Sequence, residues 1–240
     1  MKQLKKKIKI YTTLELMSGL HVGGSKESVQ IGGLDNPVIR TAIKDNQPYI
    51  PGSSLKGKMR CLLEQIYGIT EVGGGSKHKN EMGKDVEYKF EEKTKECQAI
   101  INLFGFANDK KPSKLIVRDA MLTDESVQML RECENLDMPY TEGKWENVID
   151  RVKGTAEHPR QTERIPAGVS FGVEFVINVW DDDIEDALLG LLRNGINALE
   201  NDYLGGSGSR GYGQIKFGEL KFEEASTDTK WEMKPVDKKV

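Results

Sequence analysis

Alternation of apolar and polar positions predicts two long strands, one early and one late in the chain. The early strand has Ile8, Ile10, Leu14 and Leu16 on one parity, with polar or amphipathic residues between them. The later strand runs from Ser170 to Trp180, and its apolar face carries Phe171, Val173, Phe175, Ile177 and Val179. This period of two is typical of strands that bury one face.

Apolar residues at helical spacing predict two long helices. Leu55 to Tyr67 forms the first, with a serine just before it as the cap; its stripe is Leu55, Met59, Leu62, Leu63 and Ile66. The second begins at Asp181-Asp182-Asp183, where carboxylates suit the helix dipole; its stripe is Ile184, Leu188, Leu191, Leu192, Ile196 and Leu199.

Shorter elements complete the order. We expect a short helix around Glu96 to Phe104, a strand from Lys114 to Leu122, a helix beginning at Thr123-Asp124 and a last strand from Gln214 to Phe222. Strand, helix, strands, helix and strand in this order favour an α+β, ferredoxin-like (RRM-like) core.

We therefore predict one domain, residues 1–222, with two interruptions. Residues 68–95, which contain Gly73-Gly74-Gly75 among many charged side chains, look like an exposed and variable insertion. Residues 134–165 are polar and without a strong period, so they look like an excursion from the core, and residues 223–240 look like a polar tail.

Composition narrows the class of function only a little. The chain has 240 residues and a net charge of −3, so a nucleic-acid interface requires its cations to gather on one face. The three cysteines show no C-x-x-C pair, which favours a reducing compartment; a zinc site requires long-range assembly with His21, His78 or His158. No signal peptide and no bilayer-spanning run is evident, so we expect a cytoplasmic protein and no membrane partner.

A glycine loop at Leu204 to Gly213 is the most distinctive segment. Residues 206–211 fit G-x-G-x-x-G, but a dinucleotide fingerprint follows a strand and opens a helix, whereas this loop follows a helix and precedes a strand. A small-molecule enzyme with a cofactor here is therefore the remotest alternative. The backbone of Gly206, Gly208 and Ser209, with the guanidinium of Arg210, suits a phosphate instead.

Two further segments could bind phosphate. Ser53 and Ser54 lie at a helix start followed by Lys56, Lys58 and Arg60, although an ordinary capped helix with a solvated basic face is an equal alternative. The second stretch, whose alternative is simply a solvated charged face, contains Arg151, Arg160 and Arg164.

Asp35 and His21 are the candidate chemical groups. Asp35 lies in a Gly-Gly-Leu-Asp-Asn-Pro loop. It either forms an Asx turn or a helix cap, or it holds a divalent metal or acts as a base near a ribose 2′-hydroxyl. His21 lies in a glycine-flanked loop, where its ring is either packed in the fold or contacts a base or a phosphate.

Five strings in order carry a family resemblance: Ser18 to Gly24, Pro51 to Gly57, Glu146 to Arg151, Pro159 to Gly168 and the glycine loop. Together they resemble the repeated backbone subunit of type III-A CRISPR effector complexes, a member of the RAMP superfamily. The resemblance covers nearly all of residues 5–222. It implies an RRM-like core that polymerises along a guide RNA, and a β-hairpin thumb, here residues 134–165, that wedges into the guide–target duplex.

The same resemblance implies cleavage of the target RNA at regular intervals, with a transiently bound divalent metal (Mg²⁺ or Mn²⁺). Asp35 matches the aspartate credited with cutting and is the candidate metal ligand. The partners implied are guide RNA, target RNA, other copies of the chain and other subunits of the effector. The candidate RNA-binding residues are His21, Ser53, Ser54, Lys56, Lys58, Arg60, Asn147, Arg151, Arg160, Arg164, Gly206, Gly208, Ser209 and Arg210.

Two other functions remain open from sequence. The first is a non-cleaving scaffold with the same fold and partners, and the presence of Asp35 favours cleavage over it. The second is a stand-alone nuclease of guide precursors that uses His21 as acid or base.

Overall fold

The computed structural model describes residues 2–23, 36–68, 95–106 and 112–238, together with the backbone of two short strands between 78 and 86. The helices are α1 (Gly52–Ile66), α2 (Lys95–Phe104), α3 (Asp124–Glu132) and α4 (Glu185–Glu200). The strands are β1 (Leu4–Leu16), β2 (Tyr49–Ile50), β3 (His78–Lys79), β4 (Asp85–Val86), β5 (Leu115–Val117), β6 (Ala120–Leu122), β7 (Glu142–Ile149), β8 (Ala156–Arg164), β9 (Ser170–Trp180), β10 (Ile215–Phe217), β11 (Lys221–Ser226) and β12 (Lys234–Val236).

One antiparallel sheet forms the centre of the molecule. Its strand order is β12-β11-β1-β9-β6-β2, with β10 also on β1 and β5 also on β9. The register of β1 on β9 pairs Leu14 with Phe171 and Ile8 with Ile177, so the two apolar parities share one face. All four of these side chains are fully buried. The two strands predicted from alternation are confirmed, and β1 begins four residues earlier than the pattern indicated.

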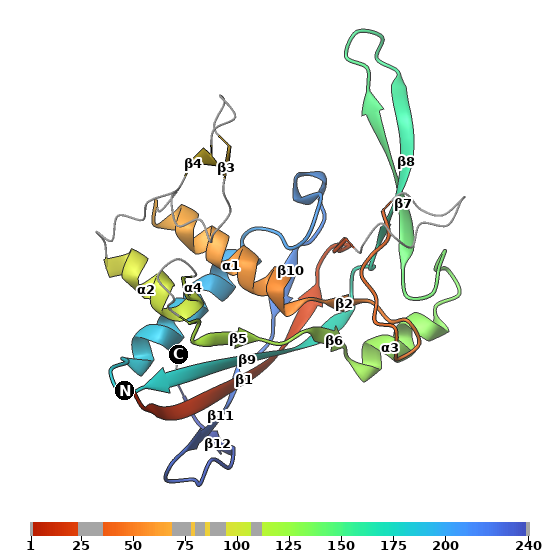
Figure 1. The fold of residues 1–240 in the computed structure, drawn as a ribbon. Coiled ribbons are helices and arrows are strands. Elements are labelled where there is room, and N and C mark those ends of the chain that lie inside the picture. Colours follow the sequence, from red (N-terminus) through yellow and green to blue (C-terminus); the bar gives the residue numbers. More distant parts are fainter. Residues whose placement is uncertain are drawn as a thin grey trace.

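Helices α1, α2 and α4 cover that apolar face of the sheet (Figure 1). Leu55, Met59 and Leu63 of α1 are at most 1% exposed. Gly195 of α4 lets the two long helices approach closely, because a Cβ there would lie 3.4–3.5 Å from the side chains of Leu63 and Met59. The α+β class is thus confirmed.

Within the described residues, no helix is long and apolar enough to cross a membrane.

Strands β7 and β8 form a separate two-stranded hairpin that projects from one end of the large sheet (Figure 1). The hairpin lies inside the excursion expected at 134–165. Its register shifts beyond the pair Glu146–Arg160, where His158 adopts a left-handed φ of 52°. The second strand of the hairpin ends at Arg164, shortly before β9 begins at Ser170. The base of the hairpin lies beside the glycine loop, since Glu146 pairs with Arg210.

Two parts of the expected polar tail, residues 223–240, belong to the sheet instead. Residues 221–226 pair with β1 as β11, and residues 234–236 pair with β11 as β12. These strands carry few apolar side chains. Polar contacts join β11 to β1: Lys6 pairs with Glu224 at 3.4 Å, and Tyr11 Oη donates a hydrogen bond to Glu223 at 3.2 Å. Ala225 is nevertheless only 1% exposed, which places β11 firmly in the sheet.

Two element boundaries also differ from prediction. The strand expected at 114–122 is divided into β5 and β6 by Arg118 and Asp119. Asp181 to Asp183 precede α4, since the Asp183 carboxylate accepts from the Trp180 N–H (2.8 Å) and pairs with Lys114. Of the 68–95 insertion, the described residues are Gly68 in the turn after α1, the backbone of β3 and β4, and Lys95, the first residue of α2; the rest lies outside the described part.

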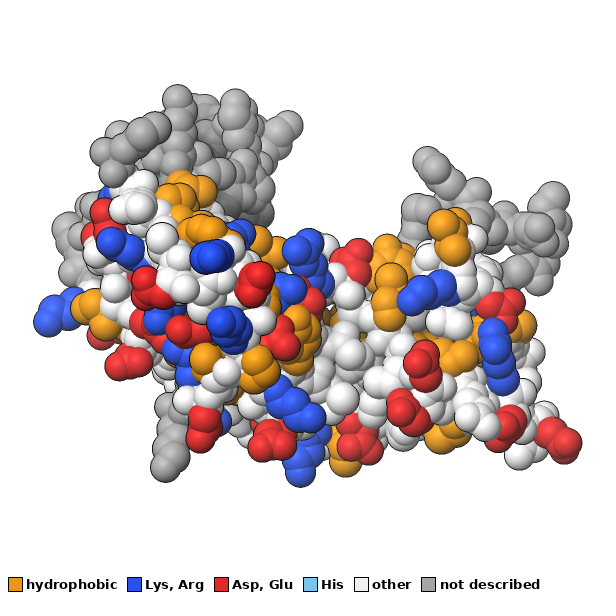
Figure 2. All heavy atoms as spheres, turned by 90° about the horizontal axis from the view of Figure 1, so that it is seen from below, with side chains coloured by type: hydrophobic (Ala, Val, Ile, Leu, Met, Phe, Trp, Pro, Cys, Tyr) orange, Lys and Arg blue, Asp and Glu red, His pale blue; other side chains and the backbone are white. Residues whose placement is uncertain are grey.

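Acidic and basic side chains intermingle on the face seen from below in Figure 2, with no extended area of one sign among the coloured residues. A nucleic-acid interface is therefore sought where the described cations gather, around the hairpin base and the glycine loop.

Candidate nucleic-acid interface

The glycine loop packs against the loop that follows β1. Gly205 has a φ of 77°, and a Cβ there would lie 2.3 Å from the backbone oxygen of His21. The next N–H, of Gly206, donates to the same oxygen at 2.8 Å. Only glycine permits this left-handed backbone at such close range. The structure thereby brings together two of the sequence-predicted sites, the glycine loop and His21.

A single 3₁₀ turn, Gly208–Arg210, presents the polar groups of the loop. Gly208 lies on the ring of Tyr203, and a Cβ at this position would overlap that ring. The same ring receives the ammonium of Lys58 at 3.9 Å from its centroid, while Lys58 also pairs with Asp202 at 2.6 Å. The start of α1 and the glycine loop are therefore neighbours. Ser209 and Arg210 remain exposed.

Side chains from the hairpin base and the glycine loop meet in one cluster, which we call the hairpin–loop cluster. Its members are Lys144, Glu146, Arg160, Arg164, Arg210 and Tyr212. Glu146 lies at its centre: its Oε2 is 2.5 Å from Arg210 Nη1 and 3.4 Å from Arg160 Nη2. The Glu146 side chain is only 8% exposed. Residues 64 positions apart in sequence thus hold the hairpin against the loop.

Tyr212 forms the floor of this cluster. Its ring is 1% exposed and lies beneath the ammonium of Lys144 (4.4 Å) and the guanidinium of Arg164 (5.2 Å). Such cation–π contacts fix the direction of long cationic side chains. Arg164 is further held by Glu142 at 2.7 Å. The cluster therefore presents several cations at defined positions on one surface.

Titration properties follow from this packing. Burial, with the nearby Glu146 carboxylate, raises the pKa of Tyr212 to about 12, so its phenol stays neutral at physiological pH. Burial opposes ionisation of Glu146, but contacts with Arg210, Tyr212 and Arg160 outweigh it and hold the Glu146 pKa below its usual value. Within the described residues, Glu146 Oε1 and the Tyr212 hydroxyl have no hydrogen-bond partner of normal geometry.

We expect Glu146→Gln to loosen the hairpin base. The folded pKa of Glu146 is lowered, so its ion pairs contribute stability above the usual glutamate pKa, near 4.5, and lose it as pH falls through the folded value. Amide-exchange protection of residues 142–164 should fall several-fold at pH 7 in the variant and lose its dependence on acid pH. Glu157→Gln, on the same hairpin, is the matched control; equal effects would contradict this assignment.

The start of α1 differs from the sequence prediction. The helix begins at Gly52, with Pro51 as its N-cap and no capping hydrogen bond from that residue's side chain. Instead, the Gly52 N–H donates to Asp119 Oδ1 at 2.8 Å, so a carboxylate between β5 and β6 occupies the place expected for a serine. Ser53 is exposed and Ser54 is half-buried at this helix start.

The three cations after this helix start are engaged by protein groups. Lys56 donates to Ser113 Oγ (2.6 Å) and to the Leu115 carbonyl (2.8 Å), and burial, helped by Arg60, lowers the Lys56 pKa. Arg60 donates to Glu64 at 2.7 Å and to the Gly105 carbonyl at 3.1 Å. Lys58 is the one that lies against the glycine loop. The structure therefore brings Lys58, rather than Lys56, to the predicted interface.

The outer half of the hairpin carries the remaining candidates. Asn147 and Arg151 are exposed, and Arg151 lies in the turn between β7 and β8. Exposed apolar side chains accompany them: Trp145 (65%), Val148 (49%), Ile149 (58%) and Val152 (95%). An exposed apolar group on a projecting hairpin is a feature of interaction sites.

Asp35 lies outside the described residues, but its neighbours along the chain are placed. Asn36 forms a parallel bridge with Thr162 of β8, and Gly23 forms an antiparallel bridge with Val38. The described chain thus enters and leaves the 24–35 segment beside the hairpin base. In the described residues there is no group of three or more His, Cys, Asp or Glu side chains that could hold a metal ion.

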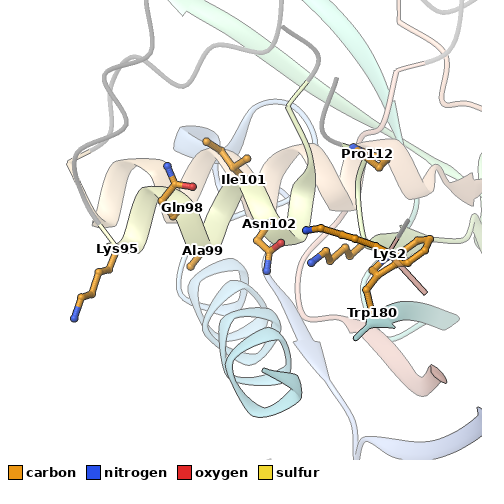
Figure 3. A pocket seen from close by; sticks show the side chains of 9 residues that line it. Lys2, Lys95, Gln98, Ala99, Ile101, Asn102, Pro112 and Trp180 are labelled. Atoms are coloured by element: carbon orange, nitrogen blue, oxygen red, sulfur yellow. The ribbon is translucent and has the colours of Figure 1, made fainter. Parts of the chain in front are cut away.

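A cavity of about 610 Å³ lies at the other end of β9, between α2, Lys2 and Trp180 (Figure 3). The eleven-residue strand β9, roughly 35 Å long, runs between this cavity and the hairpin base. Two of its lysines are already paired, Lys2 with Asp182 and Lys114 with Asp183, so we assign no ligand to it.

Three features of the site were not singled out from sequence. Glu146, Tyr212 and Glu163 are buried in polar surroundings, and each acts through partners far away along the chain. For Glu146 and Glu163 the only local signal is a charged residue inside a strand whose sequence shows no apolar period. Tyr212 lies in the loop before β10 and gives no such signal.

This architecture defines a class of protein: an α+β domain with a projecting hairpin, whose base contacts a cation-lined glycine loop. A comparison with family profiles matches residues 13–216 to the RAMP superfamily, and the chain belongs to that superfamily.

Curated relatives agree with this membership. Proteins described as "CRISPR system Cms endoribonuclease Csm3" match from Methanocaldococcus jannaschii (42% identical, covering 91% of this chain and 81% of the relative) and Streptococcus thermophilus (39%, covering 90% and 89%). The Mycobacterium tuberculosis protein of that name is 35% identical, covering 91% and 89%. A crystal structure of a Csm3–Csm4 subcomplex of the type III-A CRISPR-Cas interference complex is similar at a TM-score of 0.55 and 28% identity, covering 98% of this chain and 90% of that one.

Proposed function

We propose that this chain is the guide-RNA-binding backbone subunit of a type III CRISPR interference complex, and that it captures complementary target RNA and cleaves it at regular intervals. The endoribonuclease activity is that of its relatives, which match at 35–42% identity over most of their length. The hairpin–loop cluster is the observation that carries the proposal. It groups cations, which bind RNA phosphates, beside a projecting hairpin in a member of this superfamily.

The core is ferredoxin-like, or RRM-like, in this proposal. In support, the main strands follow the chain order β1, β5/β6, β9 and β10/β11, and they lie in the sheet with β1 between β9 and β11. Helices α1 and α4 connect these strands and lie on one face. In this arrangement the glycine loop and the loop after β1 fall at the same end of the sheet, because Leu16 at the end of β1 pairs with Ile215 at the start of β10.

The guide RNA would lie over that end of the sheet. Arg210, Arg160, Arg164 and Lys144 can meet successive phosphates, with backbone N–H groups of the glycine loop beside them. Glu146 pairs with the Arg210 and Arg160 guanidinium groups and so holds both at this surface before RNA binds. Binding should therefore weaken steeply with salt, because phosphate contacts dominate it.

The hairpin acts as the thumb in this proposal. Its exposed apolar side chains, Trp145, Val148, Ile149 and Val152, are of the kind that proteins insert between stacked bases. Unstacking one target nucleotide frees its ribose to align for in-line attack. The 2′-hydroxyl gives up its proton to solvent as its oxygen attacks the adjacent phosphorus and forms a 2′,3′-cyclic phosphate, and the 5′-oxygen leaves and takes up a proton from water. RNA thus supplies its own nucleophile.

Asp35 is the proposed catalytic residue and metal ligand. It orients the 2′-hydroxyl or holds a divalent ion, Mg²⁺ or Mn²⁺, which supplies charge neutralisation at the phosphate. A hard cation bound through one carboxylate and substrate phosphates suits a chain whose described residues contain no acidic cluster. Copies of the chain along the guide RNA, together with the other subunits of the effector, complete the cytoplasmic particle.

Reconstitution of the whole effector tests this function. The purified complex should contain small RNAs of discrete length and cut a complementary target at even spacing, and EDTA should stop the cutting. A complex that captures target RNA without cutting it would support the alternative, a non-cleaving scaffold. Cleavage of a repeat hairpin by the isolated chain would support a stand-alone nuclease instead.

A further inference from the structure

The Glu146 carboxylate, at the centre of the hairpin–loop cluster, is buried but only half paired. Its side chain is 8% exposed, and its Oε2 accepts from both Arg210 and Arg160. Within the described residues, its Oε1 has no hydrogen-bond partner of normal geometry. A buried carboxylate is costly unless its oxygens are paired. This carboxylate would therefore gain hydrogen bonds to water on leaving its place, and the contact with Arg210 is one that a stronger partner can replace.

Both arginines keep part of their side chain open to solvent. Arg210 is 44% exposed and Arg160 is 43% exposed. A guanidinium has five N–H donors in a fixed fork and keeps its charge in proteins, and Arg210 gives Glu146 only the donors of Nη1. An RNA phosphate can therefore approach the exposed part of Arg210, where its negative charge repels the carboxylate on the same guanidinium.

A second cation lies beside Arg210. The ammonium of Lys144 donates to the backbone oxygen of Arg210 at 3.2 Å and lies 4.4 Å from the centroid of the Tyr212 ring. Both of these partners are uncharged, so they leave the charge of Lys144 in place. A phosphate on Arg210 thus meets more positive charge than Glu146 neutralises, which favours the phosphate over the carboxylate as the partner of Arg210.

The Glu146–Arg210 pair also lies at the point where the hairpin can bend. The register is regular up to the pair of Glu146 with Arg160, and the next pair joins Val148 to Glu157. Over this step β8 contains one residue more than β7, which makes a bulge that bends the strand and interrupts the ladder. The ion pair therefore connects the glycine loop to the hairpin at its irregular point.

We propose that the Glu146–Arg210 ion pair is a contact that guide RNA opens. In the free chain the carboxylate occupies the place of a phosphate on Arg210 and ties the hairpin to the glycine loop. When guide RNA binds, a phosphate takes this place, Glu146 turns to solvent, and the hairpin is released to bend at its bulge. The inference rests on the proposed function, in that phosphates of the guide RNA lie against Arg210.

RNA affinity of the full chain is the first test, with a fluorescein-labelled single-stranded RNA as the probe. Glu146→Gln should bind this RNA about 3- to 10-fold more tightly than the wild type, because only the wild type has to break a partly buried, charge-assisted pair. Adding Arg210→Gln should shrink the gain to within about twofold, because the two residues act through one contact.

Glu157→Gln is the matched control for charge. It removes the same charge from the same hairpin at an exposed position, and its affinity should stay within about twofold of the wild type because exposed charges are screened by salt. Equal gains in Glu146→Gln and Glu157→Gln would overturn the proposal, since they would report the net charge of the hairpin alone.

Amide hydrogen exchange of residues 142–164 is the second test. In the free chain these amides should exchange faster in Glu146→Gln than in the wild type. With saturating RNA the difference should disappear, because the wild-type contact is then open as well. RNA covers the hairpin equally in both proteins, so its own protection cancels in the comparison. A difference that persists with RNA bound would overturn the release of the hairpin.

Arg210→Gln separates this proposal from the proposed function. Weaker RNA binding by Arg210→Gln, together with unchanged or weaker binding by Glu146→Gln, would overturn the exchange and leave the proposed function intact; Glu146 would then only orient Arg210. Unchanged binding by Arg210→Gln would remove the surface on which the exchange depends. A wild-type chain that binds no RNA would contradict the proposed function itself.

Discussion

Asp35→Ala in the assembled complex should abolish target cleavage while guide loading and target capture persist. The removed carboxylate is the only protein group that the proposal places at the reacting phosphate or its metal. General acid–base groups contribute about 10²- to 10⁴-fold, so the residual rate should lie at least that far below wild type. Capture should persist because phosphate contacts, through residues such as Arg210, supply the affinity.

The measurement is a single-turnover time course with end-labelled target, together with a binding titration on the same preparation. Asp45→Ala is a suitable control, since Asp45 is an exposed carboxylate in a nearby loop that contacts Arg131 (2.9 Å) and Tyr140 (2.7 Å) instead of RNA. Unchanged cutting by Asp35→Ala would show that Asp35 is not the catalytic residue. The same result would also contradict the scaffold alternative, because a scaffold does not cut.

Strands and helices that bury one face could be predicted from the sequence, because their apolar residues recur at a regular spacing. In β9 and α4 the apolar residues recur at two and at three to four residues, because each element buries one face in the single core. β7 gives no such signal, because Glu146 is the only residue of that strand to be buried. A hairpin held at its base and exposed along its length can only be recognised from the pairing of its strands.

Long-range polar contacts explain the remaining differences. β11 reads as a polar tail, yet its glutamates meet Lys6 and Tyr11 across 212 or more residues of sequence. The cap of α1 comes from Asp119, 67 residues away, where the local sequence offered two serines. At the candidate interface the sequence identified the glycine loop, His21 and Arg210. The fold supplied their partners: the Glu146 carboxylate pairs with Arg210, and the backbone carbonyl of Glu163 lies 2.7 Å from His21 Nδ1.

Gly213→Ala should be the most damaging small substitution in the glycine loop. Gly213 combines a φ of 73° with a position at which a Cβ would lie 2.0 Å from the Leu204 oxygen. Its N–H donates to the Gly19 carbonyl at 3.0 Å, and its own carbonyl accepts the Leu204 N–H at 2.9 Å. An alanine must therefore open the loop at the point where the loop closes on itself and on the chain after β1.

Gly211→Ala is the matched control, because Gly211 has a φ of 83° but faces open space. Left-handed backbone alone costs an alanine about 1 kcal/mol, whereas the overlap at Gly213 should bring the loss in unfolding free energy to on the order of 3 kcal/mol. Thermal unfolding of the full chain should show this as a drop in Tm two to three times larger for Gly213→Ala. Since the opened loop also carries Arg210, guide loading should fall in Gly213→Ala. An equal drop in Tm and equal guide loading in the two variants would show that closure of the loop on Leu204 does not govern the interface.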